Sequence, residues 1–138
     1  PYGIWSVFSS SRDGVFRTAT TKLQQESPVY VAWFRWYPDL FNGRMRAFHC
    51  LDICFWFNNT DLMYTHTGGS TAARALSDKM AASLAAFMRT GNPDAGKGAL
   101  PHWGQFTPEG GETMVLDNVP SFGPAPDAAA RALMATNK

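Results

Sequence analysis

Residues 46–57, RAFHCLDICFWF, contain one histidine and one carboxylate among apolar and aromatic side chains. His49 comes first, and Asp52 follows it three residues later, between Leu51 and Ile53. Burying a carboxylate in such surroundings is costly unless the carboxylate accepts hydrogen bonds. We therefore expect Asp52 to be buried and to organise the loop that carries His49.

Residues 29–36, VYVAWFRW, precede this stretch and are mostly apolar without alternation. Such a run predicts a strand covered on both faces, as in the interior of a parallel sheet. Pro28 disfavours helical geometry in the residue before it and should end a short helix predicted over residues 16–25. The motif RDG at residues 12–14 predicts a turn.

Residues 68–71, GGST, predict a glycine turn followed by a helix N-cap. From residue 72 the apolar side chains recur at helical spacing and predict one buried stripe: Leu76, Met80, Leu84, Phe87 and Met88. Gly91 suits a left-handed helix end, and Pro93 prevents continuation. A strand over residues 113–116 and a helix over residues 128–134 complete the expected elements.

The chain has 138 residues, the length of one ordinary domain, and its 45% hydrophobic content is sufficient for a packed core. Its net charge of +1 is spread along the chain and gives no reason to expect binding to nucleic acid. No run approaches the ~18 apolar residues of a membrane-spanning helix. Residues 1–5 lack the pattern of a secretory signal peptide, and the sequence does not indicate a compartment.

The two cysteines, Cys50 and Cys54, lie four residues apart beside His49. Three ligands from one local run rarely complete a tetrahedral site, and His66 and His102 do not have zinc-type spacing. We therefore expect no metal and two buried thiols that pack as small apolar groups. A disulfide across so short a loop is possible but strained.

The block H-x-x-D-I-x-F-x-F, residues 49–57, resembles the loop that carries the catalytic histidine of type B carboxylesterases, a family that includes para-nitrobenzyl esterases and cholinesterases. Other segments are similar to the family in the same order: residues 28–36, 76–93, 103–109 and 113–115. The resemblance implies an α/β class. It implies that residues 1–138 form the C-terminal segment of an α/β-hydrolase domain, with late strands, the histidine loop and C-terminal helices, and not a complete domain.

The resemblance also implies hydrolysis of a small carboxylic ester by a serine, a histidine and an acid, without metal or organic cofactor. His49 then acts as general base and later as general acid, and Asp52 supports its loop. Phe48, Phe55 and Trp56 are candidates for the wall of a substrate pocket, although aromatic residues here also suit a core. Cys54 stands where the family usually has proline, which should loosen the loop slightly.

The nucleophile motif Gly-x-Ser-x-Gly is absent. Residues 68–72, GGSTA, come nearest, but Ala72 replaces the last glycine and Ser70 follows the histidine, against the family order. We predict that Ser70 is a helix N-cap and that the chain alone is inactive. The serine, the acid and the oxyanion loop should lie in an upstream part of the same hydrolase.

Two other hypotheses remain. One is a non-catalytic, cholinesterase-like module for adhesion or interaction, and the other is a truncated product of unknown role. The retained His49 argues mildly against the first. In either case an apolar strand without its neighbours should pair with other chains, so we expect self-association or a complementary chain as partner.

Overall fold

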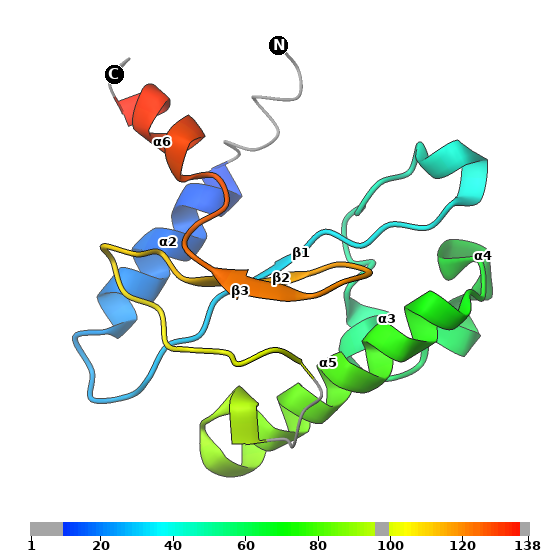
Figure 1. Ribbon diagram of the computed structural model, residues 1–138, viewed down its shortest axis with the longest axis horizontal. Helices are drawn as coiled ribbons and strands as arrows, with labels where there is room; N and C mark the ends of the chain where they lie inside the picture. Colours follow the sequence, from blue (N-terminus) through cyan, green and yellow to red (C-terminus); the bar gives the residue numbers. More distant parts are fainter. Residues whose placement is uncertain (1–9, 96–99, 136–138) are drawn as a thin grey trace. The chain divides into compact units, whose positions relative to one another are not determined.

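The computed structural model describes residues 10–95 and 100–135. They fall into two compact units. The first contains the described residues of Pro1–Val31, Gly104–Thr113 and Gly123–Lys138, and the second contains those of Ala32–Trp103 and Met114–Phe122. The predicted mixed α/β class agrees with helices and a small sheet (Figure 1).

In the first unit, helix α2 (Ser10–Lys22) buries Phe16 and Ala19 with Val31 and Phe106. Phe16 and Phe106 meet edge to face, with ring centroids 5.6 Å apart. The turn predicted at residues 12–14 is wrong, because α2 runs through them and ends before the expected residue 25. Burial of Phe16 and Ala19 offsets the poor helix propensity of Gly14. Helix α6 (Ala128–Ala135) was predicted, and its Arg131 guanidinium lies 3.6 Å from the centroid of the Phe16 ring.

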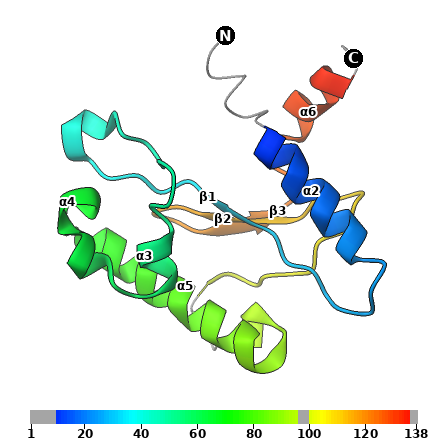
Figure 2. The same cartoon turned by 180° about the vertical axis from the view of Figure 1, so that it is seen from behind.

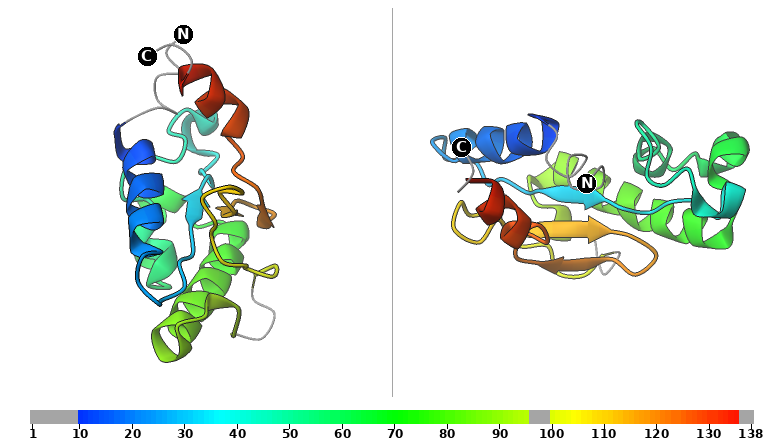
Figure 3. Two further views of the ribbon diagram at one scale, coloured as in Figure 1. Left: turned by 90° about the vertical axis from the view of Figure 1, so that its left-hand side faces the viewer. Right: turned by 90° about the horizontal axis from the view of Figure 1, so that it is seen from above.

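The second unit contains the sheet, apart from its boundary residues Thr113 and Gly123. Its strands are β1 (Ala32–Phe34), β2 (Thr113–Leu116) and β3 (Ser121–Gly123), in the order β1-β2-β3 (Figure 3). β1 and β2 are parallel, with Trp33 opposite Val115, so β1 belongs to a parallel pair as expected, although its pairing with residues 113–116 was not predicted. The strand predicted over residues 29–36 is shorter than expected. β1 is half-buried at the end of the described sheet, and β2 takes the central position.

Helix α5 (Thr71–Thr90) is the longest element of the second unit and has the predicted ends. Ser70 is its N-cap, since the Ser70 hydroxyl accepts a hydrogen bond from the Ala73 N–H at 3.1 Å. Gly91 ends it at φ 74°, and the Gly91 N–H donates to the Phe87 carbonyl at 2.7 Å. Leu76 and Met80 are buried as expected, whereas Met88 at the end of the predicted stripe is 77% exposed.

Short helices connect β1 to α5. They are η1 (Leu40–Gly43), α3 (Ile53–Trp56), η2 (Thr60–Met63) and α4 (Tyr64–Thr67), with η3 (Pro93–Ala95) after α5. α3 packs against α5 (Figure 2). A helix of one turn is not stable alone in water, so α3 depends on this packing. Among the described residues no helix has the length and apolar character needed to cross a membrane.

Gly91 offers a direct test of the α5 boundary. An added Cβ at Gly91 meets no atom within 4 Å, so Gly91→Ala carries only the backbone cost of its positive φ. We expect the free energy of unfolding to fall by about 1 kcal/mol. Gly14→Ala is the matched control, because Gly14 lies inside α2 and an added Cβ there also meets no atom within 4 Å. This variant should raise the free energy of unfolding by roughly 0.5–1 kcal/mol. Urea titration measures both, and equal signs for the two variants would contradict the assigned ends.

Candidate active-site loop

His49 occupies a tight turn that follows β1 and η1 in the chain and leads into α3. The turn is closed by the Leu51 N–H, which donates to the Phe48 carbonyl at 3.2 Å, so His49 and Cys50 are its central residues. Cys50 has φ 67° while His49 has negative φ, the combination of a type II turn. Leu51 is 2% exposed and anchors the turn, whereas the His49 side chain is exposed. The turn is therefore anchored by a buried side chain and leaves its imidazole accessible.

Residues with left-handed backbone flank His49 on both sides. Arg46 has φ 51°, Cys50 has φ 67° and Asn58 has φ 52°. For a residue with a Cβ, the left-handed region costs on the order of 1–2 kcal/mol of conformational free energy. The residue stays there only when contacts in the surrounding structure offset this cost. Strained backbone of this kind concentrates at functional sites. Phe41 and Asn42 in η1 also have positive φ, so the left-handed positions extend from η1 through the His49 turn to the end of α3.

Asp52 has a local role within this loop. It is half-buried, not fully buried as expected. Its side chain accepts a hydrogen bond from the Trp56 indole N–H at 3.3 Å, and its backbone carbonyl accepts from the Phe55 and Trp56 N–H groups. Asp52 thus links the turn to α3.

The three aromatic candidates for a pocket wall lie in different surroundings. Phe55 is completely buried, with its ring centroid 5.0 Å from that of Phe34 and 4.8 Å from that of Trp36. It is a core residue here and not an open wall. Phe48 and Trp56 are half-buried, and the Phe48 ring lies 5.9 Å from the His66 ring.

The two thiols also differ. Both are free, but Cys50 is exposed and only Cys54 is buried, so the prediction was wrong for Cys50. The Cys54 thiol donates to the Leu51 carbonyl at 3.2 Å, and burial is the main cause that raises its pKa. A raised pKa keeps this thiol protonated. Across residues 10–95 and 100–135, His, Cys, Asp and Glu side chains do not gather in any group that would hold a metal ion.

A second histidine has a carboxylate partner that sequence reasoning missed. The His102 Nδ1 lies 2.7 Å from Asp94 Oδ2, and the His102 ring is 6.2 Å from that of Phe122. This hydrogen bond from His102 is the largest cause that lowers the pKa of Asp94. A carboxylate on Nδ1 is the arrangement that orients a catalytic imidazole. The pair is therefore a rival to His49, although it lies outside the strained loop.

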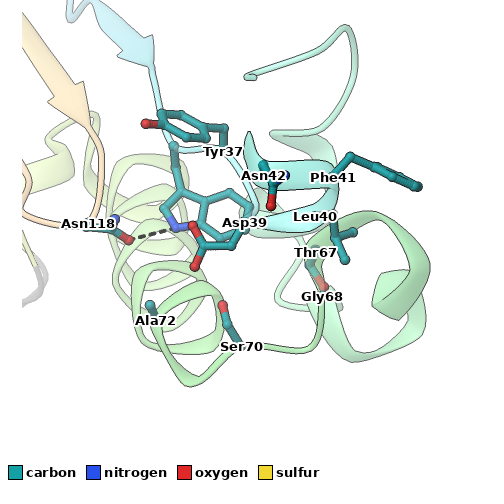
Figure 4. A pocket seen from close by; sticks show the side chains of 11 residues that line it. Tyr37, Asp39, Leu40, Phe41, Asn42, Thr67, Gly68, Ser70, Ala72 and Asn118 are labelled. Atoms are coloured by element: carbon teal, nitrogen blue, oxygen red, sulfur yellow. Dashed lines mark hydrogen bonds between the residues drawn. The ribbon is translucent and has the colours of Figure 1, made fainter. Parts of the chain in front are cut away.

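The second unit also contains a cavity of about 640 Å³ (Figure 4). It opens where the chain leaves β1 and β2, and the Trp36 indole N–H donates to Asn118 Oδ1 at 2.9 Å along its wall. Other lining residues come from η1 and from the start of α5: Asp39, Leu40, Phe41, Asn42, Ser70 and Ala72. His49 and the three aromatic candidates are not among the lining residues. This position, where the chain leaves the parallel strands β1 and β2, matches the ligand sites of open α/β sheets, which lie at the carboxyl ends of the strands.

Comparison with known proteins supports the same family that the sequence of the His49 loop resembles. A sequence profile described as the carboxylesterase family matches residues 9–133. No curated protein matches.

Solved structures of esterases resemble the chain. An esterase from anaerobic Clostridium hathewayi, which can hydrolyze aliphatic aromatic polyesters, is 28% identical with a TM-score of 0.70, over 79% of this chain and 21% of that one. A PNB esterase is 28% identical with a TM-score of 0.67, and the match covers 83% of this chain and 22% of that one. A carboxylesterase of Geobacillus stearothermophilus is 25% identical with a TM-score of 0.68, and the match covers 87% of this chain and 24% of that one. The chain thus spans less than a quarter of the length of each of these structures.

Proposed function

Because this chain belongs to the carboxylesterase family, we propose that it is the C-terminal segment of a carboxylic-ester hydrolase and supplies the catalytic histidine, His49. The observation that carries the proposal is the loop geometry. His49 is exposed in a turn whose neighbours Leu51 and Phe55 are buried and whose backbone is strained at Cys50. An imidazole held in this way is available to face a serine from the rest of the protein. Ester hydrolysis by the complete protein, with and without His49, is the test.

The proposed reaction has two halves. His49 removes the proton from the hydroxyl of a serine in the remaining part, and the serine oxygen forms a bond to the ester carbonyl carbon. His49 then gives that proton to the departing alkoxide, which leaves as the alcohol. In the second half His49 deprotonates water, the hydroxide attacks the acyl-serine, and the acid is released while the proton returns to serine. A carboxylate from the remaining part holds the imidazole in the required tautomer.

The substrate class proposed is a small carboxylic ester. Phe48 and Trp56, which are half-buried beside the His49 turn, are the aromatic residues we assign to the wall of the substrate pocket. Asp52 supports the position of Trp56, since its carboxylate accepts the Trp56 indole N–H. Phe55 takes no part in this wall, because its surface is fully covered by the core.

The isolated chain should have no serine-hydrolase activity. The Ser70 hydroxyl serves as the N-cap of α5, and the general base requires a serine from outside this chain. Incubation with a fluorophosphonate probe, followed by intact mass spectrometry, should leave the chain unmodified. A covalent adduct on Ser70 would contradict the assignment of the nucleophile to the remaining part.

The isolated chain of 138 residues should also associate with itself or with a complementary chain. Large apolar side chains of the second unit are exposed: Phe41, Phe57, Leu62 and Tyr64. Exposed apolar surface of this kind marks a contact with another chain or segment. We expect light scattering to give a dimer or larger species, or mass spectrometry to find a complementary polypeptide. A monomer that melts cooperatively would show that these residues close their own core.

A further inference from the structure

Ser77 is a polar side chain at the centre of the buried face of α5. It is 0% exposed and lies between the buried Ala73 and Met80 along the helix. Burying a hydroxyl is unfavourable unless it has a hydrogen-bond partner. Serine inside a helix commonly bonds to the carbonyl one turn earlier in the same helix. The Ser77 hydroxyl instead makes its contacts with a different segment.

The partners of Ser77 are at the end of α3, 22 and 19 residues earlier in the chain. Its Oγ lies 3.1 Å from the Phe55 carbonyl oxygen and 3.0 Å from Asn58 Oδ1. The Asn58 N–H also donates to the Phe55 carbonyl, at 3.3 Å. The Phe55 carbonyl, at the end of α3, therefore lies within reach of two donors, the Asn58 N–H and the Ser77 hydroxyl. A hydroxyl has one proton, so it donates to one of the two oxygens at a time.

Short local hydrogen bonds join α3 to the turn that carries His49. The Ile53 N–H donates to the Cys50 carbonyl at 3.3 Å, and the Cys54 thiol donates to the Leu51 carbonyl at 3.2 Å. The turn that holds His49 is therefore joined directly to the first turn of α3. A shift of α3 would move the imidazole.

We propose that Ser77 is a positioning residue for His49, fixing the catalytic loop to α5 through the Phe55 carbonyl and Asn58. The inference rests on the proposed function of His49. Loss of the hydroxyl releases the end of α3, and a displacement of about 1 Å at a catalytic group lowers turnover roughly 100-fold. The Ser77→Ala variant of the complete protein should therefore lose kcat by a factor of roughly 10 to 100, with KM changed little.

Ser83 gives a matched control, because it is also a buried serine of α5, 2% exposed. Ser83→Ala should keep kcat near that of the wild type. Ser77→Thr retains the hydroxyl and should retain more kcat than Ser77→Ala. Equal kcat for Ser77→Ala and Ser83→Ala, or equal losses for Ser77→Ala and Ser77→Thr, would overturn the positioning role.

A double variant separates this inference from the proposed function. If Ser77 acts through His49, adding Ser77→Ala to His49→Ala should cause no further loss of kcat. The same fold loss in both backgrounds would overturn the positioning role while leaving His49 as general base. Full activity of His49→Ala alone would instead overturn the proposed function, and the positioning role with it.

Discussion

Replacing His49 with alanine in the complete protein is expected to lower kcat for ester hydrolysis by a factor on the order of 10³ to 10⁶. Without the imidazole, no group takes the serine proton during attack or returns it to the leaving alcohol. The fold should be retained, because His49 is exposed and the turn is anchored by Leu51. Stopped-flow and steady-state hydrolysis of a chromogenic ester measure the loss.

The two other histidines are the controls for this prediction. His66→Ala and His102→Ala should each change kcat by less than tenfold. His102 is the sharper control, since it already has a carboxylate, Asp94, 2.7 Å from its Nδ1. A large loss in His102→Ala with near-normal His49→Ala would transfer the general-base role to the His102–Asp94 pair.

Replacing Phe55 with alanine is expected to lower the free energy of unfolding by about 3–5 kcal/mol. Phe55 is fully buried, and its ring packs on Phe34 of β1 and on Trp36. Deleting the ring loses its burial and leaves a cavity between α3 and the end of β1. Guanidinium titration of the complete protein measures the change.

Phe55→Leu is the control, because it keeps most of the buried volume and should lose less than about 1.5 kcal/mol. If Phe55 were instead an open pocket wall, Phe55→Ala would change KM for the ester and leave stability nearly unaffected. That result would contradict the core role.

Elements fixed by local chemistry were predictable from sequence. Ser70 and Gly91 set the ends of α5 through a side-chain cap and a left-handed backbone, and neither depends on distant residues. The turn expected at residues 12–14 failed because packing of Phe16 against Phe106, 90 positions away in the numbering, outweighs the local preference of Gly14. The order of β1 and β2 in the sheet likewise depends on contacts between distant segments.

The candidate site was predictable to the extent that one motif carries it. His49 and Asp52 stand at fixed spacing in residues 46–57, whereas the same stretch is uniformly aromatic after Cys54. Nothing in that composition distinguishes the buried Phe55 from the exposed Phe57. Contacts between residues that folding brings together leave no motif in the local sequence.

Two such pairs could not be read from the sequence. Ser77 contacts the Phe55 carbonyl from 22 residues away, and His102 reaches Asp94 from eight residues away without a recognisable motif. Strain at Cys50 was also hidden, because positive φ at a cysteine has no sequence signature.

The most direct test of the central claim is a crystal structure of the complete protein after its serine has reacted with a fluorophosphonate. We predict that a ring nitrogen of His49 lies within about 3.2 Å of the modified serine oxygen, the reach of a general base. His49 distant from that oxygen, with His102 or another base in its place, would contradict the account.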